Sequence, residues 1–406
     1  MNFYFDKPNE LNLHVIPEIK QVRPRHQLES FYQKGNAKFI TSKSYKEPGI
    51  YLIEVSKMAH QWTNGPFFNS FNIFKNLPIH VVSAVKANRL RIVILSIVEG
   101  NNFITESWDG FKALTNIIRK LGLPKNSVLV VSGDVFVANE YAQWCKENKE
   151  EPFIEFIGGS EGPYSLISNE RIANSIARDC ENPYSYSSLN RAHRPHRTEH
   201  LFAIAKRGIL KKGLVSGGLF FETEGIGTNR YVQTSKQVWN SILKSYYPRT
   251  VDIADLATNN PANDINLFIY ENALLSVVTE TFFEETGLFV TEKTWKPISV
   301  GSPQLVLGQP YLISYLKSKF NINIKFPGIN HLYDDTTDHV ERFLMFHESL
   351  ISWCSTPLRV KRKLSIMWDE QLIENRRILH SIDFKKVVVD DIIESTKLYF
   401  QTRLTT

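Results

Sequence analysis

Residues Leu274–Gly308 read LLSVVTETFFEETGLFVTEKTWKPISVGSPQLVLG, and this stretch decides the fold of the second half of the chain. It begins with an apolar run that ends in the carboxylate of Glu280 and continues through a loop. A helix then opens at Thr291, Glu292 and Lys293, and a second apolar run ends before Gly308. Two strands beside a helix N-terminus form the ligand crevice typical of an open α/β sheet.

The helix that opens at Thr291 is suited to binding phosphate. A helix start offers backbone N–H groups and the positive end of the helix dipole. Thr291 would cap the helix, Lys293 would contact phosphate, and Glu292 would contact ribose hydroxyls. Thr-Glu-Lys is also a common helix opening, so the prediction depends on the whole arrangement around it.

The same stretch resembles the donor-binding motif of GT-B glycosyltransferases similar to α1,3-fucosyltransferases, and that of uncharacterised phage-encoded proteins. The matching residues are Glu280, Thr291, Glu292, Lys293 and Gly308. The resemblance implies that Glu292 and Lys293 contact the ribose and phosphates of a nucleotide sugar. The family strand more often continues Glu-Asn-Ser, whereas Thr-Phe follows the first glutamate here, which leaves the nucleotide base open between UDP and GDP. Outside these 35 residues the agreement is one of architecture only.

A second group of candidate residues lies in the run LNRAHRPHR at 189–197. Pro195 suits the first turn of a helix. Planar guanidinium groups bind phosphate oxygens in pairs, so Arg191, Arg194 and Arg197 are candidates for a diphosphate clamp. The resemblance likewise implies an arginine from this region against the donor phosphates. The alternative is a solvated basic turn. No acidic cluster accompanies the two histidines, so we expect no metal site.

Apolar runs without alternation predict buried strands of parallel sheets, and apolar residues spaced three or four apart predict helices. Residues 1–45 are polar and are expected to lie outside the core. In the first half, the helices are expected at Ser107–Leu121, capped by Ser107, and Phe136–Asn148, and the strands at Gly49–Val55, Ile79–Val85, Arg91–Val98, Ser127–Ser132 and Pro152–Ile157. In the second half, the strands are expected at Leu274–Thr279 and Gln304–Leu307, and the helices at Thr198–Leu210, Lys236–Tyr246, Lys293–Val300, Tyr311–Phe320, Thr337–Trp353, Leu358–Leu379 and Val387–Phe400.

These elements predict an α/β, GT-B-like fold with two Rossmann-like doubly wound lobes and a cleft between them. A chain of 406 residues exceeds what one core usually organises, which also favours two domains. We expect an acceptor-side lobe over residues 1–180, a nucleotide-sugar-binding lobe over 181–382, and a C-terminal helix over 383–406 that returns to the first lobe.

Composition limits the class of protein. No apolar run is long enough for a membrane span, and residues 1–10 lack the apolar core of a signal peptide. Three widely spaced cysteines suit a reducing compartment, so we expect the cytoplasm, or the host cytoplasm if the protein is phage-encoded. The net charge is +6. A second basic run, Arg359, Lys361, Arg362 and Lys363, is either a solvated helix face or a site for an anionic partner.

We therefore expect an enzyme, a hexosyl- or pentosyltransferase, that moves a sugar from a UDP- or GDP-sugar to a hydroxyl without a metal or bound cofactor. If the reaction inverts configuration, a base is required, and Glu99 and Asp134 are candidates at strand ends of the first lobe. The alternative for both residues is an acidic residue in a turn, with no catalytic role. The acceptor is either a hydroxymethylated pyrimidine in phage DNA or a cell-surface glycan or protein. A non-catalytic nucleotide- or nucleic-acid-binding protein is the alternative of a different class. The oligomeric state is left open.

Overall fold

The computed structural model describes most of the chain in two compact units. Unit 1 comprises Met1–Gly162, Thr286–Phe289 and Asp383–Thr406, and unit 2 comprises Pro163–Glu285 and Val290–Ile382. The expected domain boundary at residue 180 lies outside the described residues. The structure describes residues 2–5, 38–41, 48–54, 74, 77–96, 103–105, 108–159, 183–190, 194–217, 231, 236–246, 265–284, 287–382 and 384–404.

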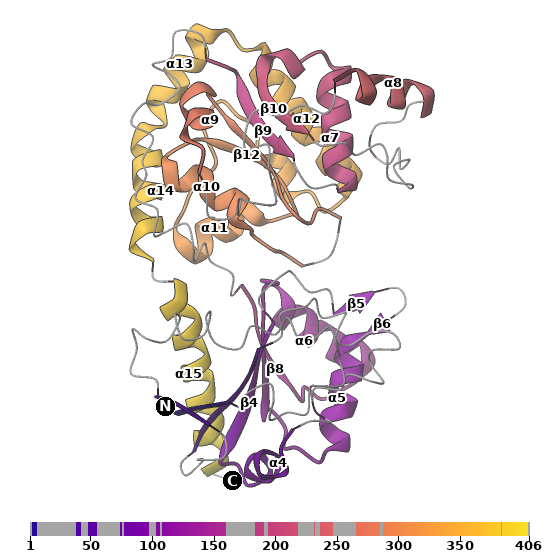
Figure 1. The fold of residues 1–406 in the computed structure, drawn as a ribbon, viewed down its shortest axis with the longest axis vertical. Coiled ribbons are helices and arrows are strands. Elements are labelled where there is room, and N and C mark those ends of the chain that lie inside the picture. Colours follow the sequence, from indigo (N-terminus) through magenta and orange to yellow (C-terminus); the bar gives the residue numbers. More distant parts are fainter. Residues whose placement is uncertain are drawn as a thin grey trace. The chain divides into compact units, whose positions relative to one another are not determined.

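Unit 1 is built on a six-stranded parallel sheet (Figure 1). The strand order is β2-β1-β3-β4-β7-β8. The strands are β1 (Asn2–Phe5), β2 (Lys38–Thr41), β3 (Gly49–Glu54), β4 (Leu90–Ser96), β7 (Val128–Ser132) and β8 (Glu155–Ile157). A small hairpin, β5 (Ile104–Thr105) and β6 (Trp108–Asp109), precedes helix α5.

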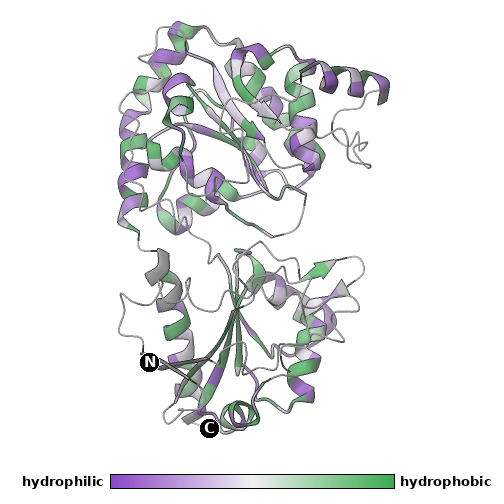
Figure 2. Cartoon of the chain, viewed as in Figure 1, coloured by the Kyte–Doolittle hydropathy of each residue, from purple (hydrophilic) through white to green (hydrophobic). Residues whose placement is uncertain are grey.

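Helices cover both faces of this sheet. Successive residues of a strand point to opposite faces; in β4, Ile92 and Ile94 join one apolar cluster while Val93 and Leu95 join another. The first cluster is covered by α4 (Ile79–Lys86), α5 (Gly110–Lys120) and α6 (Val137–Asn148). The second is closed by Ile392 of α15 (Phe384–Leu404). Figure 2 shows hydrophobic residues on the strands and mixed residues on the outer helices.

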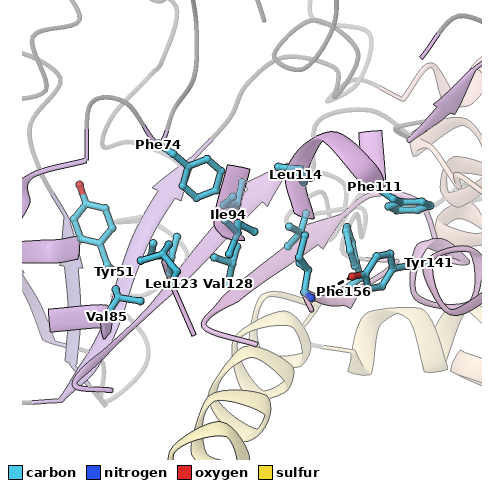
Figure 3. Packing of buried hydrophobic residues seen from close by; sticks show 14 of the residues in the cluster. Tyr51, Phe74, Val85, Ile94, Phe111, Leu114, Leu123, Val128, Tyr141 and Phe156 are labelled. Atoms are coloured by element: carbon cyan, nitrogen blue, oxygen red, sulfur yellow. Dashed lines mark hydrogen bonds between the residues drawn. The ribbon is translucent and has the colours of Figure 1, made fainter. Parts of the chain in front are cut away.

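Aromatic rings fill the larger of the two clusters. Figure 3 shows Phe111, Tyr141 and Phe156 packed together, with ring centroids 4.7–5.3 Å apart. Below the other face, α15 is fixed to the sheet by polar contacts. The buried Arg91 of β4 donates hydrogen bonds to Glu155 and to Ser395 of α15, and Ser395 donates to Glu155. The C-terminal helix therefore packs within unit 1.

Unit 2 has a four-stranded parallel sheet in the order β10-β9-β11-β12. Its strands are β9 (Tyr186–Asn190), β10 (Gly213–Gly217), β11 (Ser276–Thr279) and β12 (Gln304–Leu307). Its helices are α7 (Pro195–Lys206), α8 (Lys236–Tyr246), α9 (Leu267–Asn272), α10 (Glu292–Val300), α11 (Leu312–Phe320), α12 (His339–Ser355), α13 (Leu358–Met367) and α14 (Asp369–Ser381), with short 3₁₀ turns at Leu210–Lys212 and Leu332–Asp335.

The two sheets share one winding order. In unit 1, β2 lies on one side of β1, and β3 and the later strands lie on the other side. In unit 2, β10 lies on one side of β9, and β11 and β12 lie on the other side. This is the doubly wound order whose winding reverses between the first and third strands, where ligands bind in open α/β sheets. The expected α/β class with two doubly wound sheets is confirmed. In unit 2 the reversal lies between β9 and β11.

Several sequence-based expectations were wrong. Ile79–Val85 is a helix, because Val81, Ala84 and Val85 form one buried face while Ile79 is exposed. Residues 1–45 are not outside the core throughout, since β1 and β2 belong to the sheet. The cap of α5 is Asp109, whose carboxylate accepts from the Lys112 N–H, and not Ser107.

The expected helix Leu358–Leu379 is two helices that meet at the buried Trp368. Strand β10 was not predicted. Among the described residues no helix is long and apolar enough to cross a membrane. Cys145 and Cys354 are buried free thiols.

Candidate functional site

The candidate site lies where β9 and β11 end. Backbone pairing between them joins Ser187 to Ser276 and Ser188 to Val277. Both strands continue two residues further, to Asn190 and Thr279. The last two residues of each strand are therefore not paired with the other strand through the backbone. Side chains connect the two strand ends instead, and these side chains line the base of the switch point.

Helix α7 supplies the first of these side chains. The Arg197 Nη2 donates to the carbonyl oxygens of Thr279, at 3.1 Å, and Glu280, at 2.8 Å. The His196 Nε2 donates to the same Glu280 carbonyl at 2.9 Å. Both side chains are buried. Burial lowers the pKa of Arg197 to about 10, so its guanidinium is charged at neutral pH. Arg197 thus holds the end of β11 in this structure.

A chain of buried hydrogen bonds leads from the strand ends to helices α7 and α12. Thr279 Oγ1 donates to Asn190 Oδ1 at 2.7 Å, and Asn190 Nδ2 donates to Ser188 Oγ at 2.9 Å. The Ser188 hydroxyl lies 3.0 Å from His200 Nε2, and His200 Nδ1 lies 3.0 Å from His347 Nε2. All five side chains are buried.

The direction of this chain follows from its last member. His347 Nδ1 lies 2.8 Å from the Phe343 carbonyl, which can only accept. His347 Nε2 must then accept from His200 Nδ1, and His200 Nε2 must accept from the Ser188 hydroxyl. Burial lowers the pKa of both histidines, of His347 to about 4, so both rings are neutral at neutral pH.

Glu280 organises the start of α10. Its carboxylate is fully buried, and each oxygen accepts one hydroxyl and one backbone N–H. Oε2 accepts from Thr291 Oγ1 at 2.5 Å and from the Thr281 N–H at 3.2 Å. Oε1 accepts from Thr294 Oγ1 at 2.5 Å and from the Thr291 N–H at 3.2 Å. A carboxylate at a helix N-terminus also complements the helix dipole.

Lys293 and Glu292 lie on the solvent side of this helix start, with side chains 30% and 31% exposed. The Lys293 ammonium lies 2.9 Å from Glu292 Oε1 and 3.2 and 3.3 Å from the hydroxyls of Thr291 and Thr281. Burial raises the pKa of Glu292, but Lys293 and Lys296 outweigh it and leave a net lowering. As expected, Thr291 caps α10, accepting from the Lys293 N–H.

Arg194 is the N-cap residue of α7, and its side chain makes no capping hydrogen bond. Lys293 is the second residue of α10, so each of the two helix starts carries a cation. Burial is the main reason that the pKa of His196 falls to about 3, and the charges of Arg197, Arg194 and Lys293 lower it further. Arg194 and Arg197 belong to the start of α7 and Lys293 to the start of α10. Glu280, at the end of β11, binds both helix starts: its carbonyl accepts from α7 and its carboxylate accepts from Thr291.

In unit 1, Asp134 follows β7 and is buried. Its Oδ1 accepts from the N–H groups of Phe136 and Leu288, each at 2.9 Å. Burial raises its pKa to about 6. Burial and Asp134 raise the pKa of Glu140 to about 8, so Glu140 is the proton donor within the pair. Asp134 therefore holds the 287–289 segment, and a Cβ at Gly287 would come 2.4 Å from its Oδ2.

The remaining candidates are not described. Glu99 and Arg191 lie outside the described residues. Within the described part of the chain, no three His, Cys, Asp or Glu side chains form a metal-binding group. The base roles of Glu99 and Asp134 stay predictions.

Several residues of the site were not predicted from the sequence, namely Asn190, Thr279, Thr281, His200 and His347. Asn190 and Thr279 carried a usable signal, because a polar residue at the end of a buried strand often faces the ligand edge of the sheet. His200 and His347 are 147 positions apart, and nothing local to either residue indicates the pairing.

Comparisons with known proteins give little further guidance. No protein-family model matches the chain, and no curated protein matches it. A solved structure that it resembles is the catalytic domain of starch synthase IV from Arabidopsis thaliana bound to ADP and acarbose. The identity is 13%, the coverage is 88% of this chain and 74% of that chain, and the TM-score is 0.39. A likeness at this level identifies neither a family nor an activity.

Proposed function

We propose that this protein is a nucleotide-sugar-dependent glycosyltransferase of GT-B type that binds the donor diphosphate at the switch point of unit 2. One observation carries the proposal: the N-termini of α7 and α10 both bind Glu280 at the end of β11, and Arg194 and Lys293 lie at these two helix starts. The Glu280 carbonyl accepts from His196 and Arg197, and its carboxylate accepts from Thr291 and Thr294. Helix N-termini and cations at a switch point suit a pyrophosphate.

The residues would divide into two roles. Arg194 and Lys293 contact the phosphates and, with the two helix dipoles, stabilise the charge that develops on the leaving nucleoside diphosphate. Glu292 accepts from ribose hydroxyls, as the resemblance of the Thr-Glu-Lys motif implies. Glu280 and Arg197 hold the helix starts and the strand end in place, since their polar groups are already engaged within the protein.

In the reaction, the bond between the anomeric carbon and the diphosphate oxygen breaks, and the acceptor oxygen forms the new glycosidic bond. The hydroxyl proton passes to a base if configuration inverts, for which Glu99 and Asp134 are the candidates. The two cations supply the charge that a metal would otherwise supply, so the donor is expected to bind without one. The acceptor is a hydroxymethylated pyrimidine in DNA or a glycan or protein hydroxyl.

The test is nucleotide binding followed by turnover. UDP or GDP at about 100 times its Kd should add about 2.7 kcal/mol of stability and raise the melting temperature in a thermal shift assay. Removing one charge-assisted phosphate contact costs about 2 kcal/mol, so Lys293→Ala and Arg194→Ala should each weaken binding roughly 30-fold. Lys206→Ala, at the opposite end of α7, is the matched control and should bind as the parent does.

Turnover distinguishes the classes of function. A panel of UDP- and GDP-sugars should release nucleoside diphosphate from at least one donor. Binding without release would identify a non-catalytic nucleotide-binding protein instead. If neither nucleotide binds, and Lys293→Ala changes nothing, the proposal is wrong. Salt-dependent binding to duplex DNA would favour the DNA acceptor over a glycan, because phosphate contacts release counterions.

A further inference from the structure

The basic run at 359–363 is not part of the candidate site, and α13 presents it in an unusual way. The outward face of α13 is formed by Arg359, Val360, Lys363, Ile366 and Met367, which span an arc of about 120° on the helix. Val360, Ile366 and Met367 are 43%, 61% and 66% exposed. We call these five residues the α13 face. It combines three exposed apolar side chains with two exposed cations, and it contains no acid.

The opposite side of α13 is fixed to unit 2. Lys361 is buried, its ammonium donates to Ser185 Oγ at 2.7 Å, and it lies over the Trp353 ring. Ser365, one turn further on, is also buried and donates to the Lys361 carbonyl. The orientation of the helix is thus set by polar and aromatic contacts on its inner side. The outward display of the α13 face follows from this packing.

We propose that the α13 face docks on an anionic lipid bilayer. Cations interleaved with exposed aliphatic side chains on one helix face suit the membrane interface, where lipid headgroups take the charges and the apolar groups enter the acyl boundary. No ion pair among the described residues engages Arg359 or Lys363, so both charges are available to a partner. The helix would lie in the plane of the interface.

Other occupants fit this face less well. A two-fold contact between copies of the chain would bring the two cations of one copy close to the two cations of the other, with no acid on the face to offset the repulsion. A nucleic acid would take the two cations through its phosphates but would leave Ile366 and Met367 without a favourable environment. A bilayer accommodates both kinds of side chain at once.

The experiment is co-sedimentation of the full chain with vesicles, without nucleotide or acceptor, so its outcome is independent of the proposed enzyme activity. The protein should bind vesicles of equal parts phosphatidylcholine and phosphatidylglycerol and should not bind vesicles of phosphatidylcholine alone. Each cation near an anionic surface changes partitioning roughly fivefold, so Arg359→Gln with Lys363→Gln should lower it roughly 30-fold. Ile366→Ser with Met367→Ser should lower it at least about tenfold.

Matched controls exclude effects of net charge and general hydrophobicity. Lys112→Gln with Lys146→Gln removes the same charge from exposed positions of unit 1. Leu398→Ser removes a helix side chain that is 62% exposed, close to the 61% of Ile366. Both controls should sediment as the parent does. Equal binding to neutral vesicles, parent-like binding by the α13 variants, or duplex DNA binding that depends on the α13 face without vesicle binding would each overturn the proposal.

Discussion

Replacing Glu280 by Gln tests the claim that this carboxylate organises the phosphate-binding end of α10. Each carboxylate oxygen accepts one hydroxyl and one backbone N–H. In the variant, the new amide NH₂ must face either the part-buried Thr281 N–H or the buried Thr291 N–H, so one of these donors loses its acceptor. The neighbouring hydroxyl also loses a bond to a charged group. An unsatisfied buried donor costs about 1–3 kcal/mol, and loss of charge at the helix start adds about 0.5 kcal/mol.

We expect the variant to lower the local stability of α10 by about 3 kcal/mol, which corresponds to a roughly 100-fold increase in amide exchange. Hydrogen exchange of the 291–300 segment measures this directly, whereas global unfolding of a two-unit chain need not be two-state. Glu292→Gln is the control, because Glu292 is the first residue of α10 and its side chain is 31% exposed. The hydroxyls of Thr291 and Thr294 donate to Glu280 and not to Glu292. Parent-like exchange in the Glu280→Gln protein would refute the organising role.

Three further predictions concern other buried contacts. Gly287→Ala forces a Cβ against the Asp134 carboxylate at a backbone φ of +89°, so the melting temperature should fall, and differential scanning fluorimetry should show no change if this contact is absent. The pKa values of Asp134 and Glu140 are raised, so the folded chain binds more protons than the unfolded chain between about pH 4 and pH 8. The free energy of unfolding should therefore decline as pH rises through this window. The Glu140→Gln variant should flatten a plot of melting temperature against pH. The His347→Phe variant leaves the His200 Nδ1 hydrogen without its acceptor, which costs about 2 kcal/mol. The melting temperature should fall by roughly 5 °C. An unchanged melting temperature would contradict the deduced tautomers.

The local chemistry of the chain determines the motif at Leu274–Gly308. The apolar run of β11, the Thr291 cap and the αL glycine Gly301 that ends α10 each act through neighbours only a few residues away. Such features can be recognised from a sequence, because capping, turn conformation and strand burial depend on residue types at fixed spacing. The same reasoning failed at Ile79–Val85, where β-branched residues favour a strand but packing against the sheet selects the helix.

The assembly of the site depends on contacts between residues distant in the chain, and these are decided by packing alone. Arg197 was expected on the donor phosphates, but in the structure its guanidinium binds carbonyls 82 and 83 positions away, because β9 and β11 stop pairing before they end. The His200–His347 pair arises because α7 packs against α12, where His200 also contacts Phe346. A sequence specifies which polar groups need hydrogen-bond partners once they are buried, because a buried unpaired polar group costs free energy. Which groups come within hydrogen-bond distance is determined only when the chain has folded, because the partners are distant in the sequence.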